Sequence, residues 1–165
     1  MKVKIFLFCV LCCLLFGACA PQSGDYFAPF RGGFSARIEG TWQAMAFSAE
    51  VVAQPQDAQG ARVMTLTFYA PDTLADTVLT RDETGQIKVE IDGISLPLST
   101  VAAQGYGALF ALFSTDAEVT EVTQEEGGTR VKGTDLSLLF AADGTPLAAE
   151  NATARVQIKS FALED

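Results

Sequence analysis

Hydrophobic and polar residues alternate along most of this chain. The clearest example is QIKVEID at 86–92, in which every second residue is Ile or Val. A period of two is typical of a β-strand with one buried face and one face in water. Asp92-Gly93 then indicates a tight turn, and the alternation resumes in ISLPL at 94–98. These two segments therefore predict a β-hairpin with one buried apolar face.

Comparable segments recur along the chain, separated by turn residues. Glu83-Thr84-Gly85, Gly127-Gly128 and Asp143-Gly144-Thr145-Pro146 are such turn signals. Their close spacing favours an antiparallel meander over βαβ units, which need a helix between successive strands. The further predicted strands are 62–69, 75–81, 118–123, 129–132, 136–140 and 153–163.

Two segments near the start resemble each other. FSARIEG at 34–40 is echoed by FSAEVVA at 47–53, and both place apolar residues on one face. The echo is too short to indicate a repeat architecture. We interpret the pair as two neighbouring strands of one sheet, with the corner near Gly40 and Thr41.

The segment 99–114 follows a helical pattern instead. Its apolar residues fall at i, i+4, i+7, i+8 and i+11: Ala102, Tyr106, Leu109, Phe110 and Phe113. Ser99 or Thr100 can cap the start of this helix. Gly105 and Gly107 each cost up to about 1 kcal/mol of helix stability, so we expect the helix to be short or broken in its first half.

These elements predict a mainly β (α+β) fold. A sheet with one wet face offers one apolar face to receive the stripe of the helix. The expected architecture is a single curved antiparallel sheet, a half-barrel meander, wrapped around one short apolar helix. Whether this arrangement encloses a ligand cavity or is simply a packed core stays open at this point.

The N-terminus reads as a targeting signal. Lys2 and Lys4 precede an apolar run at 5–16, which is too short to span about 30 Å of hydrocarbon and is typical of a secretory signal peptide. The run leads into LFGAC at 15–19, which resembles the lipobox of bacterial lipoproteins, although Phe16 stands where Leu is usual. In that family the cysteine sulfur receives a diacylglyceryl group and the signal is cut just before it. The resemblance therefore implies lipidation of Cys19.

Two alternatives to the lipobox are ordinary secretion, with cleavage at Ala18-Cys19-Ala20, and a retained anchor helix. In ordinary secretion Pro21 would directly follow the cut, and a proline at that position usually blocks cleavage. With the lipobox, we expect a signal peptide at 1–18, a lipidated N-terminus and tether at 19–33, and one β domain at 34–165. Two acyl chains give a stable anchor where one is marginal. The expected location is the extracytoplasmic face of the cell membrane, or the outer membrane where the organism has one.

Charge and composition exclude several function classes. Removal of residues 1–18, with their two lysines, changes the formal charge from −9 to −11. A domain this acidic is repelled by nucleic acid and by anionic headgroups. The sequence has no histidine, so no Ser-His-Asp or Cys-His relay can form, and it has no Gly-rich phosphate loop. A carboxylate pair acting as acid and base is the remaining route to catalysis. We expect no enzyme, no cofactor and no metal site.

The lipidated N-terminus, the half-barrel and the inserted helix together resemble the LolA-like group, over roughly 34–163. This group includes periplasmic carriers of lipoproteins and mycobacterial lipoproteins that hold glycolipids on a concave apolar surface closed by a helix. The resemblance implies a candidate ligand lining of eight residues: Trp42, Phe47, Met64, Phe68, Ile91, Leu109, Phe110 and Phe113. It assigns no role to Arg37 or Arg62, because the arginine that ties the lid of the classical carriers cannot be aligned.

Two functions from different classes follow. The first is a membrane-tethered module that binds a lipid or another apolar ligand in the half-barrel. The second is a structural or interaction lipoprotein of the cell envelope, with a filled core and a protein partner. A lined cavity favours the first, and a solid core with one exposed apolar patch favours the second.

Overall fold

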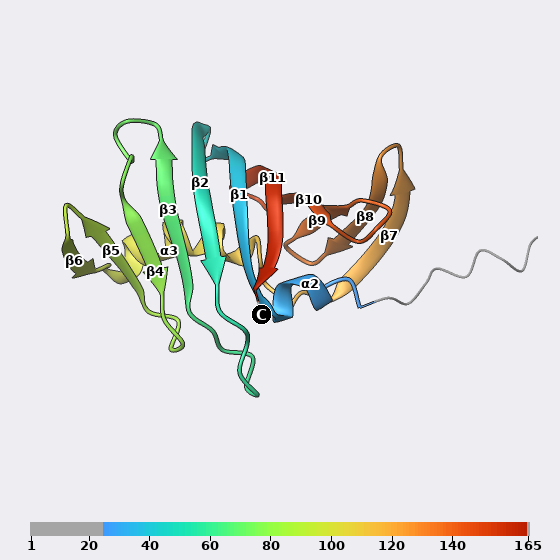
Figure 1. The fold of residues 1–165 in the computed structure, drawn as a ribbon, viewed down its shortest axis with the longest axis horizontal. Coiled ribbons are helices and arrows are strands. Elements are labelled where there is room, and N and C mark those ends of the chain that lie inside the picture. Colours follow the sequence, from blue (N-terminus) through green and yellow to red (C-terminus); the bar gives the residue numbers. More distant parts are fainter. Residues whose placement is uncertain (1–24, 165) are drawn as a thin grey trace, which may run out of the picture.

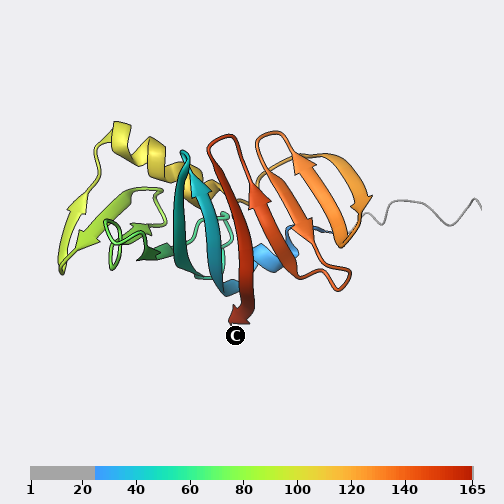
Figure 2. The same ribbon diagram turned by 90° about the horizontal axis from the view of Figure 1, so that it is seen from above.

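A computed structural model describes residues 25–164, which form one curved, unclosed sheet of eleven antiparallel strands with a helix along its concave side (Figure 1, Figure 2). In chain order the elements are α2 (Ala28–Arg31), β1 (Gly33–Trp42), β2 (Met45–Ala53), β3 (Met64–Ala70), β4 (Val78–Arg81), β5 (Ile87–Ile91), β6 (Ile94–Pro97), α3 (Thr100–Ala111), β7 (Val119–Glu125), β8 (Gly128–Gly133), β9 (Ser137–Phe140), β10 (Pro146–Glu150) and β11 (Ala154–Glu164). The expected fold class is confirmed.

The chain enters the sheet in the middle rather than at an edge. The strand order is β6-β5-β4-β3-β2-β1-β11-β10-β9-β8-β7. β1 to β6 therefore build one half outwards, α3 crosses towards the other half, and β7 to β11 return to the centre, where β11 pairs with β1. Figure 2 shows α3 on one side of the sheet, running from the β6 edge towards the centre. This connection places the helix over the concave side.

The corner between β1 and β2 differs from the expectation. The two strands are joined by Gln43 and Ala44, which both have positive φ, 49° and 68°, as a tight two-residue hairpin requires. The corner predicted near Gly40 and Thr41 is therefore wrong. Gly40 lies inside β1, where a Cβ atom would come within 2.0 Å of the Arg155 carbonyl oxygen. This glycine lets β1 approach β11 closely.

The other predicted strands are present, with their ends shifted by a few residues. β10 was not predicted; it lies between the segments that were expected to flank one turn, and it pairs with both β9 and β11. Its sequence, PLAAE, begins with proline and is rich in alanine, a combination with little β signal. The region 25–33, expected to belong to the tether, carries α2 and contributes the buried Phe27 and Phe30 to the core.

α3 is a short helix, as one form of the expectation has it, and it runs unbroken through both of its glycines, so the alternative of a break in its first half is wrong. Ser99 is its N-cap residue but makes no side-chain capping bond. The second half and the residues just after it supply four completely buried side chains: Leu109, Phe110, Leu112 and Phe113. Burial of these large side chains outweighs the helix cost of two glycines.

Candidate functional site

Seven of the eight residues expected to line a ligand site lie together in one buried cluster between α3 and the sheet: Trp42, Phe47, Met64, Phe68, Leu109, Phe110 and Phe113. The least buried of the seven, Trp42, is 8% exposed. The eighth, Ile91, lies outside this cluster at the end of β5 and is 53% exposed. The structure therefore separates a packed region under α3 from an open region at the β5–β6 end.

The open region consists of three aliphatic side chains, Ile91, Ile94 and Leu96, here called the exposed patch. Their exposed fractions are 53%, 64% and 56%. Ile91 faces Ile94 across the β5–β6 ladder, and Leu96 faces Val89, so the patch occupies one face of the hairpin. The prediction that this apolar face would be buried is wrong for these residues.

The exposed patch lies on the concave face. Ile87 shares its face by the alternation of β5, and Ile87 is buried beside α3, with its Cδ1 atom 4.0 Å from the position of a Cβ on Gly107. β5 and β6 therefore continue the core-facing surface of the sheet beyond the cover of the helix. Figure 1 shows these two strands at the end of the sheet.

The first half of α3 is less enclosed than the second. The Tyr106 ring lies 4.8 Å from the Trp42 ring, centroid to centroid. The Trp42 Nε1 atom is buried, and among residues 25–164 it has no hydrogen-bond partner. A buried donor without an acceptor costs about 1–3 kcal/mol.

Arg62 is a buried cation to which the sequence assigned no role. Its guanidinium donates to the Phe30 carbonyl oxygen and, at 2.5 Å, to the Phe113 carbonyl oxygen, and it lies 5.3 Å from the Phe34 ring centroid. Burial is the main cause that lowers the pKa of Arg62 to about 10, with the charge of Arg81 as the next cause, so it stays protonated at neutral pH. Arg62 thus ties α2 and the end of α3 to the sheet.

Arg81, the last residue of β4, also points to the concave face. It is paired with Met64 on one side and Ile87 on the other, and both are buried. Its guanidinium carbon lies 5.7 Å from the centroid of the Phe110 ring. Burial lowers the pKa of Arg81, and the charge of Asp116 partly offsets this effect.

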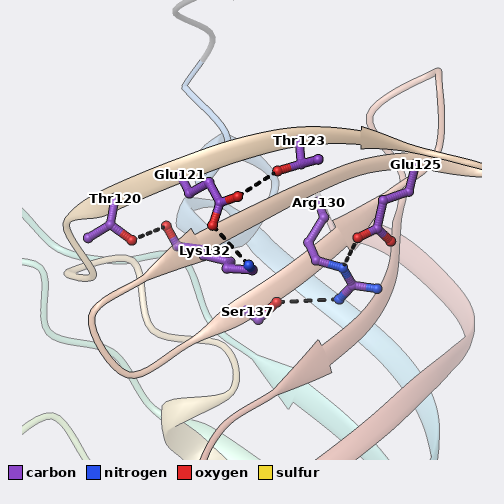
Figure 3. Close-up of polar contacts among 7 residues, drawn as sticks. All are labelled: Thr120, Glu121, Thr123, Glu125, Arg130, Lys132 and Ser137. Carbon is purple, nitrogen blue, oxygen red and sulfur yellow. Dashed lines mark hydrogen bonds and ion pairs between the residues drawn. The ribbon is translucent and has the colours of Figure 1, made fainter.

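The opposite, convex face carries several ion pairs. On β7 and β8, Arg130 forms an ion pair with Glu125 at 2.6 Å, and Lys132 pairs with Glu121 at 2.8 Å (Figure 3). A groove of about 590 Å³ lies beside them and reaches Arg155, which pairs with Glu150 at 2.5 Å. Each cation of this groove already has a carboxylate partner, so the groove offers no unpaired charge to a ligand.

The expected lipidation residue, Cys19, lies outside the described residues. In the part of the chain that the structure describes, no helix is both long and apolar enough to cross a membrane. Nor do three or more Cys, Asp or Glu side chains group as metal ligands within residues 25–164.

No protein-family model and no curated protein matches this sequence. Among solved structures, it is similar to an uncharacterized conserved protein from Thermus thermophilus, with a TM-score of 0.54 and 14% identity over 86% of this chain and 84% of that one. It is also similar to MucB, with a TM-score of 0.52 and 13% identity over 89% of this chain but only 60% of MucB. A putative outer membrane lipoprotein-sorting protein domain from Vibrio parahaemolyticus gives a TM-score of 0.46 and 9% identity over 87% of this chain and 93% of that one. Such low identities concern the fold alone, which the chain shares with the first two proteins.

Proposed function

We propose that the protein is a membrane-anchored, extracytoplasmic module that binds a lipid or another apolar ligand on the concave side of its sheet, at the β5–β6 end. One observation carries the proposal: the exposed patch leaves three aliphatic side chains in water on the same concave face that packs against α3, so the apolar surface of the half-barrel continues beyond its filled core. A filled core with an exposed patch is also the arrangement expected of an interaction protein, which is therefore the second candidate function. Exposed apolar surface of this kind on a folded domain marks a site of interaction. The anchor on Cys19, the extracytoplasmic location and the absence of enzyme activity belong to the same proposal and rest on the sequence.

The proposed ligand lies beside α3 and not beneath its second half. Leu109, Phe110 and Phe113 are completely buried there, so the space between helix and sheet is filled by side chains. Arg62 also holds the end of the helix in place through the Phe113 carbonyl oxygen. Binding at the β5–β6 end leaves these contacts unchanged.

An interaction protein is the second candidate function. β6 is an edge strand with a neighbour only on its β5 side, and an edge strand with apolar side chains can pair with a strand of another protein. MucB, which shares the fold, has been solved in complex with MucA. For the present chain this candidate means a protein partner in the cell envelope.

Photo-crosslinking separates the two candidates. The lipidated protein is reconstituted in phosphatidylcholine vesicles with a photoactivatable fatty acid, and the labelled peptides are identified by mass spectrometry. We expect adducts in 86–98. Ile94→Asn is expected to reduce them about tenfold, because an aliphatic side chain contributes about 1.5–3 kcal/mol when it is buried by a ligand.

Val52→Asn is the matched control. Val52 is 38% exposed but lies on the convex face, since its neighbours in β2, Val51 and Ala53, are buried. This variant should leave the labelling of 86–98 unchanged. Adducts spread evenly along the chain, or insensitive to Ile94→Asn, would contradict lipid binding at the patch and favour the interaction protein.

A further inference from the structure

Arg81 is a cation on an apolar face without a counter-ion in contact. No carboxylate of residues 25–164 lies within 4.0 Å of its guanidinium nitrogens, and no hydrogen bond from this group is found in that range. Its side chain is half-buried between Met64, Ile87 and Phe110. A partly desolvated charge in such surroundings is costly unless an opposite charge compensates it.

The neighbouring charges do not supply that compensation. Arg62 is close enough to interact unfavourably with Arg81, and Asp116 is the acidic group that attracts both. Asp116 is exposed and makes an ion pair with neither arginine. Arg62 donates hydrogen bonds to two backbone carbonyl oxygens, although its Nε atom has no partner among residues 25–164. The Arg81 guanidinium makes no hydrogen bond or ion pair within those residues and lies over the Phe110 ring. The concave face thus carries one arginine with a structural role and one available to a ligand.

Arg81 lies in line with the exposed patch. It stands opposite Ile87, the first residue of β5, and Ile91 is four residues further along the same strand, or about 13 Å at about 3.3 Å per residue. Val89 lies between them on the same face. Gly107 of α3 presents no side chain to Ile87, so the helix is narrow where it passes over this row.

We infer that the ligand is an anionic amphiphile, with its carboxylate or phosphate headgroup held by Arg81 and its acyl chain lying along β5 towards Ile91 and Ile94. A guanidinium matches both headgroups, because its fork of N–H donors bonds two oxygens of a carboxylate or phosphate at once. The aliphatic row along β5 then removes the chain from water. This inference rests on the proposed function and specifies the ligand class of the same site.

Three photoactivatable probes with the same acyl chain test the inference on the lipidated protein in phosphatidylcholine vesicles: a fatty acid, a phosphatidic acid and a fatty alcohol. The quantity measured is the labelled fraction of 86–98. We expect an anionic probe to label this segment on the order of tenfold more than the neutral alcohol. Arg81→Gln should remove that excess and leave labelling by the alcohol unchanged.

Two further variants have a stated expected effect on labelling by the anionic probes. Asp116→Asn removes the acidic charge that attracts Arg81 without contacting it, and should raise labelling by the anionic probes. Arg155→Gln removes the same charge as Arg81→Gln from an exposed position on the convex face and should change nothing. If Arg81→Gln fails to fold, Arg81→Lys and Asp116→Asn provide the test, since the first keeps the charge and the second changes an exposed residue.

The outcomes are distinguishable. Preference for the fatty acid alone or for phosphatidic acid alone supports the inference and names the headgroup. Equal labelling of 86–98 by all three probes overturns the inference but leaves the proposed function standing. Labelling of 86–98 by none of them overturns both.

Discussion

The two arginines of the concave face, Arg62 and Arg81, have different roles: the first stabilises the fold, and the second is proposed to bind a ligand. Arg62 donates hydrogen bonds to carbonyl oxygens 32 and 51 residues away along the chain. Its Nε atom is buried without a partner among the described residues, so its donors are not all used. Removing the two bonds it does make uncovers two buried acceptors.

Arg62→Met should lower the free energy of unfolding by roughly 3 kcal/mol, because hydrogen bonds from a charged donor contribute about 1.5–3 kcal/mol each and the carbonyls of Phe30 and Phe113 lose their donor. Urea denaturation measures this change. Arg155→Met is the control, since its ion pair with Glu150 is exposed to solvent and such pairs contribute little to stability. Similar small effects from both variants would contradict the structural role of Arg62.

Part of this site can be read from the sequence. In the alternation of 62–69 and 75–81, Arg62 shares the face of Met64, and Arg81 shares the face of Leu79. The sequence therefore predicts that both arginine side chains lie on the buried face of their strands. What each one contacts is not predictable, because Phe30, Phe110 and Phe113 belong to other elements that only the tertiary structure brings near.

At the scale of elements, α3 and β1 show opposite uses of glycine. Gly105 and Gly107 lie in the half-buried part of α3, where the nearest atoms to an added Cβ are 3.9 Å and 4.0 Å away. Those distances are ordinary van der Waals contacts. Gly40 in β1 leaves no room at all for a Cβ beside the Arg155 carbonyl oxygen.

Gly105→Ala and Gly107→Ala should therefore each stabilise the protein, by up to about 1 kcal/mol, since alanine favours the helix over glycine and meets no obstacle. Gly40→Ala should destabilise it, because two central strands must move apart. Thermal unfolding of the three variants measures both signs. A loss of stability in Gly107→Ala would mean that α3 packs on Ile87 without room for a methyl group.

The period of two predicted most strands because alternation reports burial on one side of a sheet. The prediction failed where alternation in the sequence and burial in the structure do not correspond. In β5 and β6 the apolar residues alternate correctly, yet Ile91, Ile94 and Leu96 stay exposed because α3 does not extend over them. β10 was missed because its alanines carry little pattern, and the Gln43-Ala44 turn because it lacks Asn and Gly. Seven of the eight residues expected to line a ligand site lie together in the core. The eighth, Ile91, lies beyond the part of the sheet that α3 covers.

At the scale of the whole molecule, the described chain begins beside α2, which lies apart from the proposed site. α2, which follows the N-terminal residues, packs through Phe30 against Phe140 and Phe113, whereas the exposed patch lies beyond β4 at the other side of the centre (Figure 1). If Cys19 carries the proposed lipid, the tether joins the domain through the residues that precede α2.

Cys19→Ser should release the protein from membranes or stop its processing, because a serine oxygen does not receive the diacylglyceryl group that the lipobox resemblance implies. Detergent phase partitioning and the mass of the mature chain measure both effects. A variant that partitions like the parent and is cut to the same length would show that Cys19 is not the anchor.

The pairing of β1 with β11 also governs the order in which the molecule can fold. β1 is the central strand of the sheet, and its ladder with β11 runs from the pair Gly33 and Glu164 to the pair Trp42 and Ala154. This ladder therefore joins segments more than a hundred residues apart. Long sequence separation slows folding, because the loop must close before the contact is gained. Until residues 154–164 are available, β1 and β10 each have an unpaired edge and the two halves of the sheet are not joined. A chain that crosses a membrane unfolded would thus reach its final shape only when its last strand has passed through.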